Sequence, residues 1–93
     1  MESYTVSGEL SIYTASNEKQ NLFAFLQSGD ELEVNLSQVS EFDTAGLQVL
    51  IVLKQAAIQH QKILHYVMHS KAVLDVLEMT NMTGIFGDQV VLT

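Results

Sequence analysis

The feature that most constrains the fold is a repeated change in apolar spacing along the chain. Apolar residues alternate strictly with polar ones in residues 32–36, and strand-forming residues fill 63–67. From Leu22 to Leu26, and again beyond Leu47, apolar residues instead recur at helical spacing. Alternation is typical of strands and the longer spacing of helices. Because strands separated by helices pair in parallel through right-handed crossovers, the pattern predicts an α/β fold.

The ends of the chain add detail to this prediction. Residues 4–6 and 9–13 have strand character and flank Ser7-Gly8, which predicts a hairpin with an antiparallel edge. Ser70 is expected to cap a third helix, and residues 89–92 are compatible with a last short strand. The predicted order is β-β-α-β-α-β-α-(β), a mixed, mainly parallel sheet packed by helices.

Length and charge exclude several classes of protein. The chain has 93 residues, which suits a single domain over 1–93. Its net charge is −7, with four lysines and no arginine, so we expect no nucleic-acid partner. Cysteine is absent, which excludes disulfides and thiolate chemistry. Residues 45–53 form the longest nearly apolar stretch and are too short to span a bilayer. With its acidic first residues, the chain is expected to be cytoplasmic and not inserted in a membrane.

The most informative stretch is Asp43-Thr44-Ala45-Gly46-Leu47, at a predicted strand-to-helix junction. An oxygen of Asp43 or Thr44 can cap the helix start, where backbone N–H groups lack partners. Gly46 in the first turn costs about 1 kcal/mol of helix propensity relative to alanine. Close approach of another chain or of the neighbouring strand would explain it. On local chemistry alone, the stretch is a capped helix start.

This run resembles the Asp-Ser/Thr-x-Gly-Leu signature of STAS domains, the fold of bacterial anti-sigma factor antagonists. Residues 8–15 look like the early strand and helix entry of that family, and residues 32–42 like its central strand. The resemblance implies that Thr44 is the phosphorylation site, flanked by Asp43, Ala45 and Gly46. Ser11 is a departure, because many members carry Asp there.

The resemblance implies a regulatory binding protein, not an enzyme. Its partner would be an anti-sigma factor or a related histidine-kinase-like ATPase with serine/threonine kinase activity. A chemosensory pathway is a close variant. The alternative is a constitutive accessory subunit of an ABC-type lipid transporter. A ligand-sensing domain is less compatible with the acidic composition.

The helix after the motif offers a docking face for such a partner. Gln48, Val52, Gln55 and Gln59 fall on one polar but uncharged stripe. An ordinary exposed stripe is the alternative. The residues expected at the partner interface are Leu47, Gln48, Val52, Gln55, Ser11 and Tyr13.

Neither a catalytic site nor a cofactor site is indicated. His60, His65 and His69 lack a shared helical face, a cysteine or a converging carboxylate cluster, so we expect no metal. No spacing aligns a catalytic triad. The scattered glycines match no phosphate-cradling loop or dinucleotide fingerprint, so we expect no cofactor. We expect the free protein to be a monomer.

Overall fold

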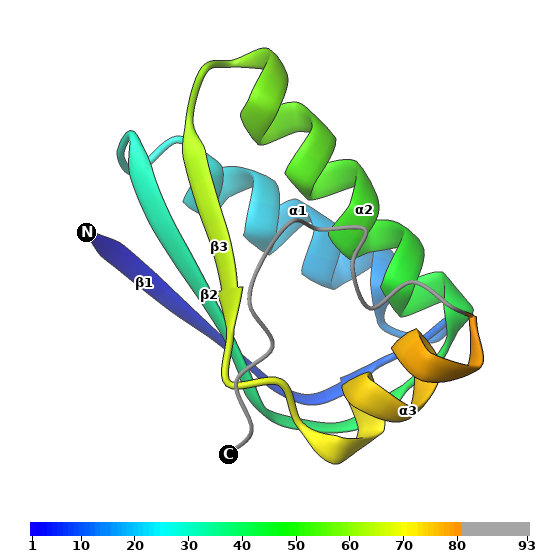
Figure 1. The fold of residues 1–93 in the computed structure, drawn as a ribbon. Helices are drawn as coiled ribbons and strands as arrows, with labels where there is room; N and C mark the ends of the chain where they lie inside the picture. The colour runs from blue at the N-terminus through cyan, green and yellow to red at the C-terminus, as the bar shows by residue number, and fades with distance from the viewer. Residues whose placement is uncertain (81–93) are drawn as a thin grey trace.

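Strands and helices alternate regularly along residues 1–80, the part of the chain that the computed structural model describes (Figure 1). The elements are β1 Glu2–Leu10, α1 Ala15–Leu26, β2 Glu31–Phe42, α2 Thr44–Gln59, β3 Ile63–Val67 and α3 Lys71–Met79. The strand over 63–67 and the helix capped by Ser70 are where the sequence predicts them. Ser70 Oγ accepts the Val73 N–H at 3.3 Å.

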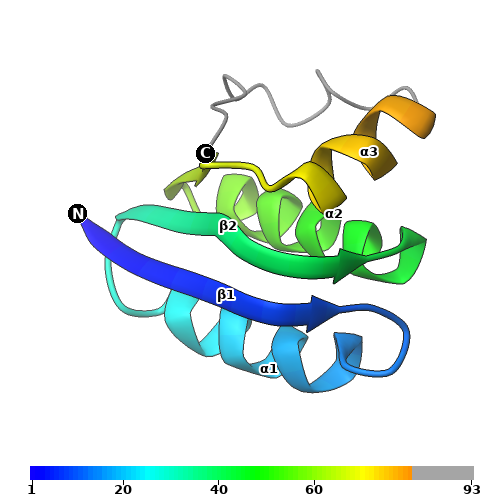
Figure 2. The same ribbon diagram turned by 90° about the horizontal axis from the view of Figure 1, so that it is seen from below.

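The described strands form one parallel sheet in the order β1-β2-β3. Helices α1 and α2 lie side by side and share one core with the sheet, while α3 packs against β2 and α2 (Figures 1 and 2). On β2, Leu32, Val34 and Leu36 face this core, whereas Glu33 and Asn35 between them are only half-buried. The predicted α/β class is confirmed.

The predicted opening hairpin is wrong, because β1 is one continuous strand. It pairs in parallel with β2 from Glu2 opposite Leu32 to Leu10 opposite Phe42. Gly8 has φ +80, which glycine adopts readily, but it belongs to an irregularity within the strand and not to a reversal of the chain. The predicted strand over 89–92 lies outside the described residues.

β2 is longer than the alternation in the sequence suggests. Its pairing register with β1 shifts between Thr5 and Ser7 and again between Gly8 and Glu9. At the first shift, the Asn35 side chain accepts the Ser37 N–H at 2.8 Å. Such a bulge reverses the faces, so burial passes from Leu36 to Val39. β2 thereby continues to Phe42 and delivers the next residues to the start of α2.

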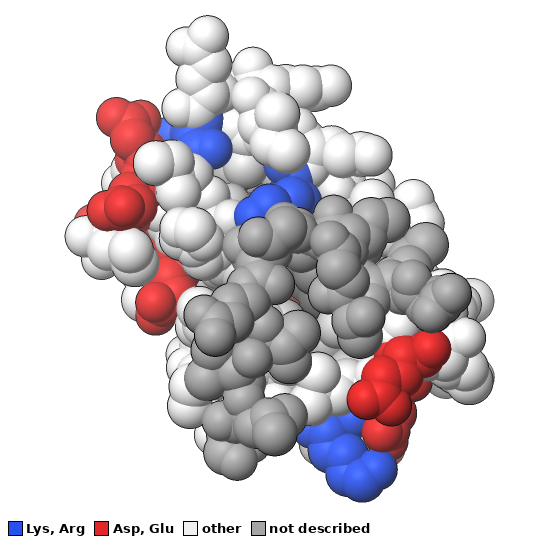
Figure 3. All heavy atoms as spheres, in the orientation of Figure 1, with Lys and Arg blue, Asp and Glu red and all other residues white. Residues whose placement is uncertain are grey.

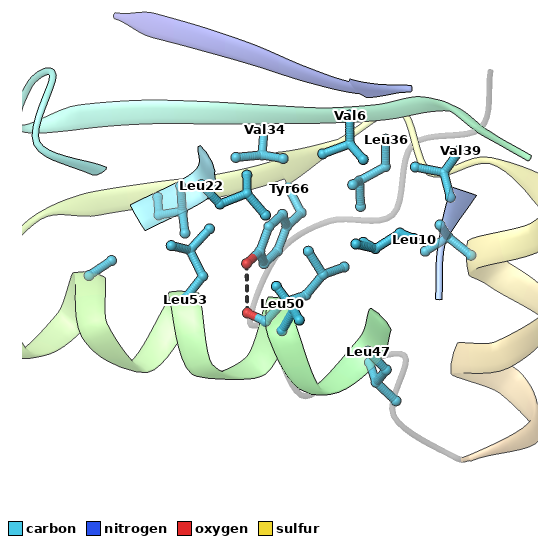
Figure 4. Close-up of a cluster of buried hydrophobic side chains, with 14 of the residues drawn as sticks. Val6, Leu10, Leu22, Val34, Leu36, Val39, Leu47, Leu50, Leu53 and Tyr66 are labelled. Atoms are coloured by element: carbon cyan, nitrogen blue, oxygen red, sulfur yellow. Dashed lines mark hydrogen bonds between the residues drawn. The ribbon is translucent and has the colours of Figure 1, made fainter. Parts of the chain in front are cut away.

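Figure 4 shows the part of the core that lies between the strands and α2. Tyr66 of β3 is the largest fully buried side chain of residues 1–80. The Tyr66 hydroxyl donates to the Leu50 carbonyl at 2.6 Å, which joins β3 to α2 and satisfies a buried polar atom. The remaining apolar residues labelled around it are Val6, Leu10, Leu22, Val34, Leu36, Val39, Leu47 and Leu53.

Candidate binding and modification site

Two loops meet at the carboxyl edge of the sheet, the edge where open α/β sheets bind ligands. Because Leu10 pairs with Phe42, β1 and β2 end side by side. The chain then continues from β1 into the turn 11–14 and from β2 into Asp43 and α2. The candidate site is built from these two continuations.

Asp43 joins the two loops. Its Oδ1 accepts the Gly46 N–H at 3.0 Å, which caps α2, and its Oδ2 accepts the Ile12 N–H at 3.0 Å. These N–H groups, Gly46 first and then Ile12, hold the pKa of the Asp43 carboxyl below its usual range. The side chain is therefore a carboxylate at neutral pH. Of the two residues predicted to be able to cap this helix, Asp43 and Thr44, Asp43 is the one that does so.

Thr44 is the first residue of α2, and its side chain is exposed. Ala45 beside it is half-buried. The hydroxyl thus lies on the surface, directly beside a carboxylate that is already engaged by backbone donors. This geometry leaves the hydroxyl accessible to a modifying enzyme.

Gly46 allows α2 to begin against the end of β1. A Cβ at this position would lie 3.0 Å from the Leu10 carbonyl carbon and 3.0 Å from Phe42 Cδ1, and it would also meet the Leu10 carbonyl oxygen. Backbone atoms cannot rotate away as a side chain does. Of the two explanations for this glycine, the neighbouring strand is therefore sufficient.

A hydrogen-bonded turn holds the β1–α1 loop. Ser11 Oγ donates to a Glu9 carboxylate oxygen and accepts the Tyr13 N–H at 3.2 Å. Thr14 Oγ1 accepts the Ser11 N–H at 3.1 Å and donates to the Glu9 carbonyl at 2.9 Å. The turn leaves Ile12 and Tyr13 at 70% and 90% exposure. Two apolar side chains therefore project beside the start of α2.

The structure separates the predicted interface residues into two groups. Gln48, Gln55 and Tyr13 are exposed and Val52 is half-buried, so these side chains are available to a partner. Leu47 and Ser11 are 4% and 8% exposed. Leu47 packs in the core and Ser11 organises the turn, so their side chains offer little surface to a partner.

Ile12 was not expected to contribute to the site. Residues 9–13 have strand character, and an apolar residue within a strand is usually placed in the core. The strand instead ends at Leu10, and the N–H of Ile12 binds Asp43 while its side chain faces outward. The signal available in the sequence was the short Ser11–Thr14 spacing, in which one hydroxyl can bond to the backbone of the other residue.

Within residues 1–80, no three His, Cys, Asp or Glu side chains converge as a metal site requires. His60 and His65 are exposed, whereas His69 is almost fully buried, at 1% exposure. In the same part of the chain, no helix has the length and apolar character needed to cross a membrane.

Comparison with known families identifies this arrangement. The model of the family described as MlaB, STAS domain matches residues 4–92. The chain belongs to the STAS domain family. The resemblance inferred from the Asp43–Leu47 motif is thereby confirmed.

A solved structure agrees with the fold of this STAS domain. The crystal structure of a candidate anti-sigma factor antagonist from Thermotoga maritima superposes with a TM-score of 0.77 at 24% sequence identity. The match covers 98% of this chain and 80% of that protein. No curated protein sequence matches the chain.

Proposed function

We propose that this STAS domain is an anti-sigma factor antagonist-type regulator whose binding surface is switched by phosphorylation of Thr44. The observation that carries the proposal is the exposed Thr44 hydroxyl at the start of α2, beside Ile12 and Tyr13. Exposed apolar side chains near a hydroxyl that can be phosphorylated suit a surface that binds a protein partner. The partner would be an anti-sigma factor or a histidine-kinase-like ATPase.

The switch would act through charge. A kinase would transfer the γ-phosphoryl group of ATP to Thr44 Oγ1, releasing ADP and the hydroxyl proton. The phosphate adds about −1.5 to −2 charge at neutral pH. The Gly46 and Ile12 N–H groups already bind Asp43, so they are not available to neutralise it. The added charge beside Asp43 would oppose burial in an interface and release the partner.

A second candidate is a constitutive accessory subunit of an ABC-type lipid transporter. Permanent interfaces are more apolar than transient ones, and the exposure of Ile12 and Tyr13 favours this role. The match to the family described as MlaB is compatible with it. In this role Thr44 would lie in a permanent interface and would not be phosphorylated and dephosphorylated.

Intact-mass analysis of the protein from its native cells separates the two roles. The regulator is expected to show a species heavier by about 80 Da, the mass of one phosphoryl group, that is absent from Thr44→Ala. Absence of this species under several growth conditions would contradict the switch. A stable ATPase complex that tolerates both Thr44→Ala and Thr44→Glu would then support the accessory-subunit role.

A further inference from the structure

A groove lies between α1 and α2 next to the candidate site. It is lined by Lys19, Ala45, Gln48, Val49 and Val52, and these residues define the α1–α2 groove. Two lining residues are close to Thr44 on α2: Ala45 is adjacent, and Gln48 is one turn further on the same face. The groove is therefore continuous with the surface around Thr44.

The walls of the groove are apolar except for one amide and one charge. Ala45, Val49 and Val52 supply aliphatic surface, whereas Gln48 and Lys19 are polar. The volume is about 220 Å³. Pockets for small-molecule ligands are larger, typically about 300–1,000 Å³, and enclose most of the ligand. The α1–α2 groove is of a size to take a side chain of another protein, and not a whole ligand.

Lys19 is distinct from the other lysines of the chain, all four of which are described. Lys62 and Lys71 form ion pairs with Asp30 and Asp75, and Lys54 donates to the Leu64 carbonyl. Lys19 makes no hydrogen bond or ion pair with any residue of the described range; its ammonium lies 5.8 Å from the centroid of the Phe23 ring. Its charge is available to a partner.

Two acidic residues close in sequence to the lining residues, Glu18 and Asp43, are already engaged. Glu18 accepts the Tyr4 hydroxyl at 2.7 Å. Burial, and secondly this carboxylate, raise the pKa of Tyr4 to about 12. Asp43 binds two backbone N–H groups. No acidic residue of the described chain lines the groove, so Lys19 provides its only charge.

We propose that the α1–α2 groove binds an aliphatic side chain of the protein partner together with an adjacent carboxylate, which pairs with Lys19. The inference rests on the proposed binding function but does not require phosphorylation. The net charge of the protein is −7, and on the face drawn in Figure 3 acidic side chains gather over the β1–β2 edge and near α3. A partner carboxylate is repelled by those surfaces and attracted at Lys19, which fixes the register of the complex.

The test is an NMR titration of the ¹⁵N-labelled full chain with two short probes, acetyl-Leu-Glu-amide and acetyl-Leu-Gln-amide. The Glu probe is expected to shift the amides of Ala45, Gln48, Val49 and Val52 and to bind about fivefold more tightly than the Gln probe. Fivefold corresponds to a favourable exposed ion pair. Lys19→Met is expected to abolish the preference, and Lys19→Arg to retain it.

Lys71→Met is the matched control, because it removes a lysine on α3 and should leave the preference unchanged. Shifts outside the groove, no shifts, or equal binding of the two probes would overturn the proposal. Tighter binding of hexanoate than of either peptide would also overturn it, since the occupant would then be a fatty acid. If the α1–α2 groove binds neither probe but phosphate is found at Thr44, the proposed groove is wrong and the proposed regulatory function is unaffected.

Discussion

The starts of α2 and α3 share a local design, yet only the first forms a candidate site. Asp43 and Ser70 each follow a strand and accept the N–H three residues ahead, at 3.0 and 3.3 Å. Ser70 is buried, and its capping bond stays within its own turn. Asp43 also holds Ile12, 31 residues away in the chain. The second oxygen of the carboxylate makes the difference, because it joins two loops into one surface.

The first residues of the two helices, Thr44 and Lys71, also differ in their interactions. Thr44 is exposed and lies near the exposed apolar side chains of the β1–α1 loop. Lys71, in the matching position of α3, pairs with Asp75 at 2.9 Å, and this pairing raises the pKa of Lys71. Both residues are exposed, but the Lys71 charge is paired within α3, whereas Thr44 lies beside a second loop that Asp43 holds in place. Helix capping by itself is therefore not evidence for a functional site.

The largest effect is expected for Gly46→Ala. The added methyl group would meet the Leu10 carbonyl and Phe42, so the free energy of unfolding should fall by about 2 kcal/mol despite the gain in helix propensity. Gly29→Ala is the control, because its Cβ would lie 3.3 Å from the flexible Glu2 side chain. Urea denaturation compares the two. Equal stability of both variants would show that α2 can move away from β1.

Replacing the two capping residues tests how much the bond from the Ile12 N–H to Asp43 Oδ2 stabilises the protein. Asp43→Ala loses two hydrogen bonds and should cost about 2 kcal/mol, whereas Ser70→Ala loses one and should cost about 1 kcal/mol. Asp43→Asn should fall between wild type and Asp43→Ala, because the amide nitrogen cannot accept the second N–H. The same denaturation measurement applies. A cost for Asp43→Ala no larger than that for Ser70→Ala would contradict a stabilising tie to Ile12.

The pH dependence of the two caps should also differ. Hydrogen bonds lower the pKa of Asp43 in the folded state, so its stabilisation is present above the unfolded pKa of about 3.9 and decreases as pH falls through the folded pKa. The difference in unfolding free energy between wild type and Asp43→Ala should therefore shrink in acid. The difference for Ser70→Ala should stay constant, because serine does not titrate in this range. If the two differences changed with pH in the same way, the lowered pKa assigned to Asp43 would be wrong.

The smallest effect on stability is expected for Thr44→Val. The side chain is exposed, and the capping is done by Asp43, so the free energy of unfolding should change by less than about 0.5 kcal/mol. Differential scanning calorimetry measures this change. A markedly larger loss would mean that Thr44 has a structural role, and effects of its variants on partner binding would then not report on the surface alone.

The sequence was sufficient for features that depend on near neighbours in the chain. It predicted the α/β class, the strand over 63–67, and the capping of α2 and α3, because spacing and cap chemistry act within a few residues. For Gly46 it left two explanations open, another chain or the neighbouring strand, and the structure shows the strand. Phosphorylation of Thr44 remains a prediction.

Tertiary structure decided what depends on partners distant in the chain. Ser7-Gly8 has the composition of a turn, but pairing of β1 with β2 along its whole length keeps it within a strand. The bulges of β2 break its alternation, so the strand extends past the point at which its pattern ends. The bond from Ile12 to Asp43 joins two separate segments, and the groove lined by Lys19 and Val52 lies between two helices. Such contacts form only when the sheet brings those elements together, and no local spacing encodes them.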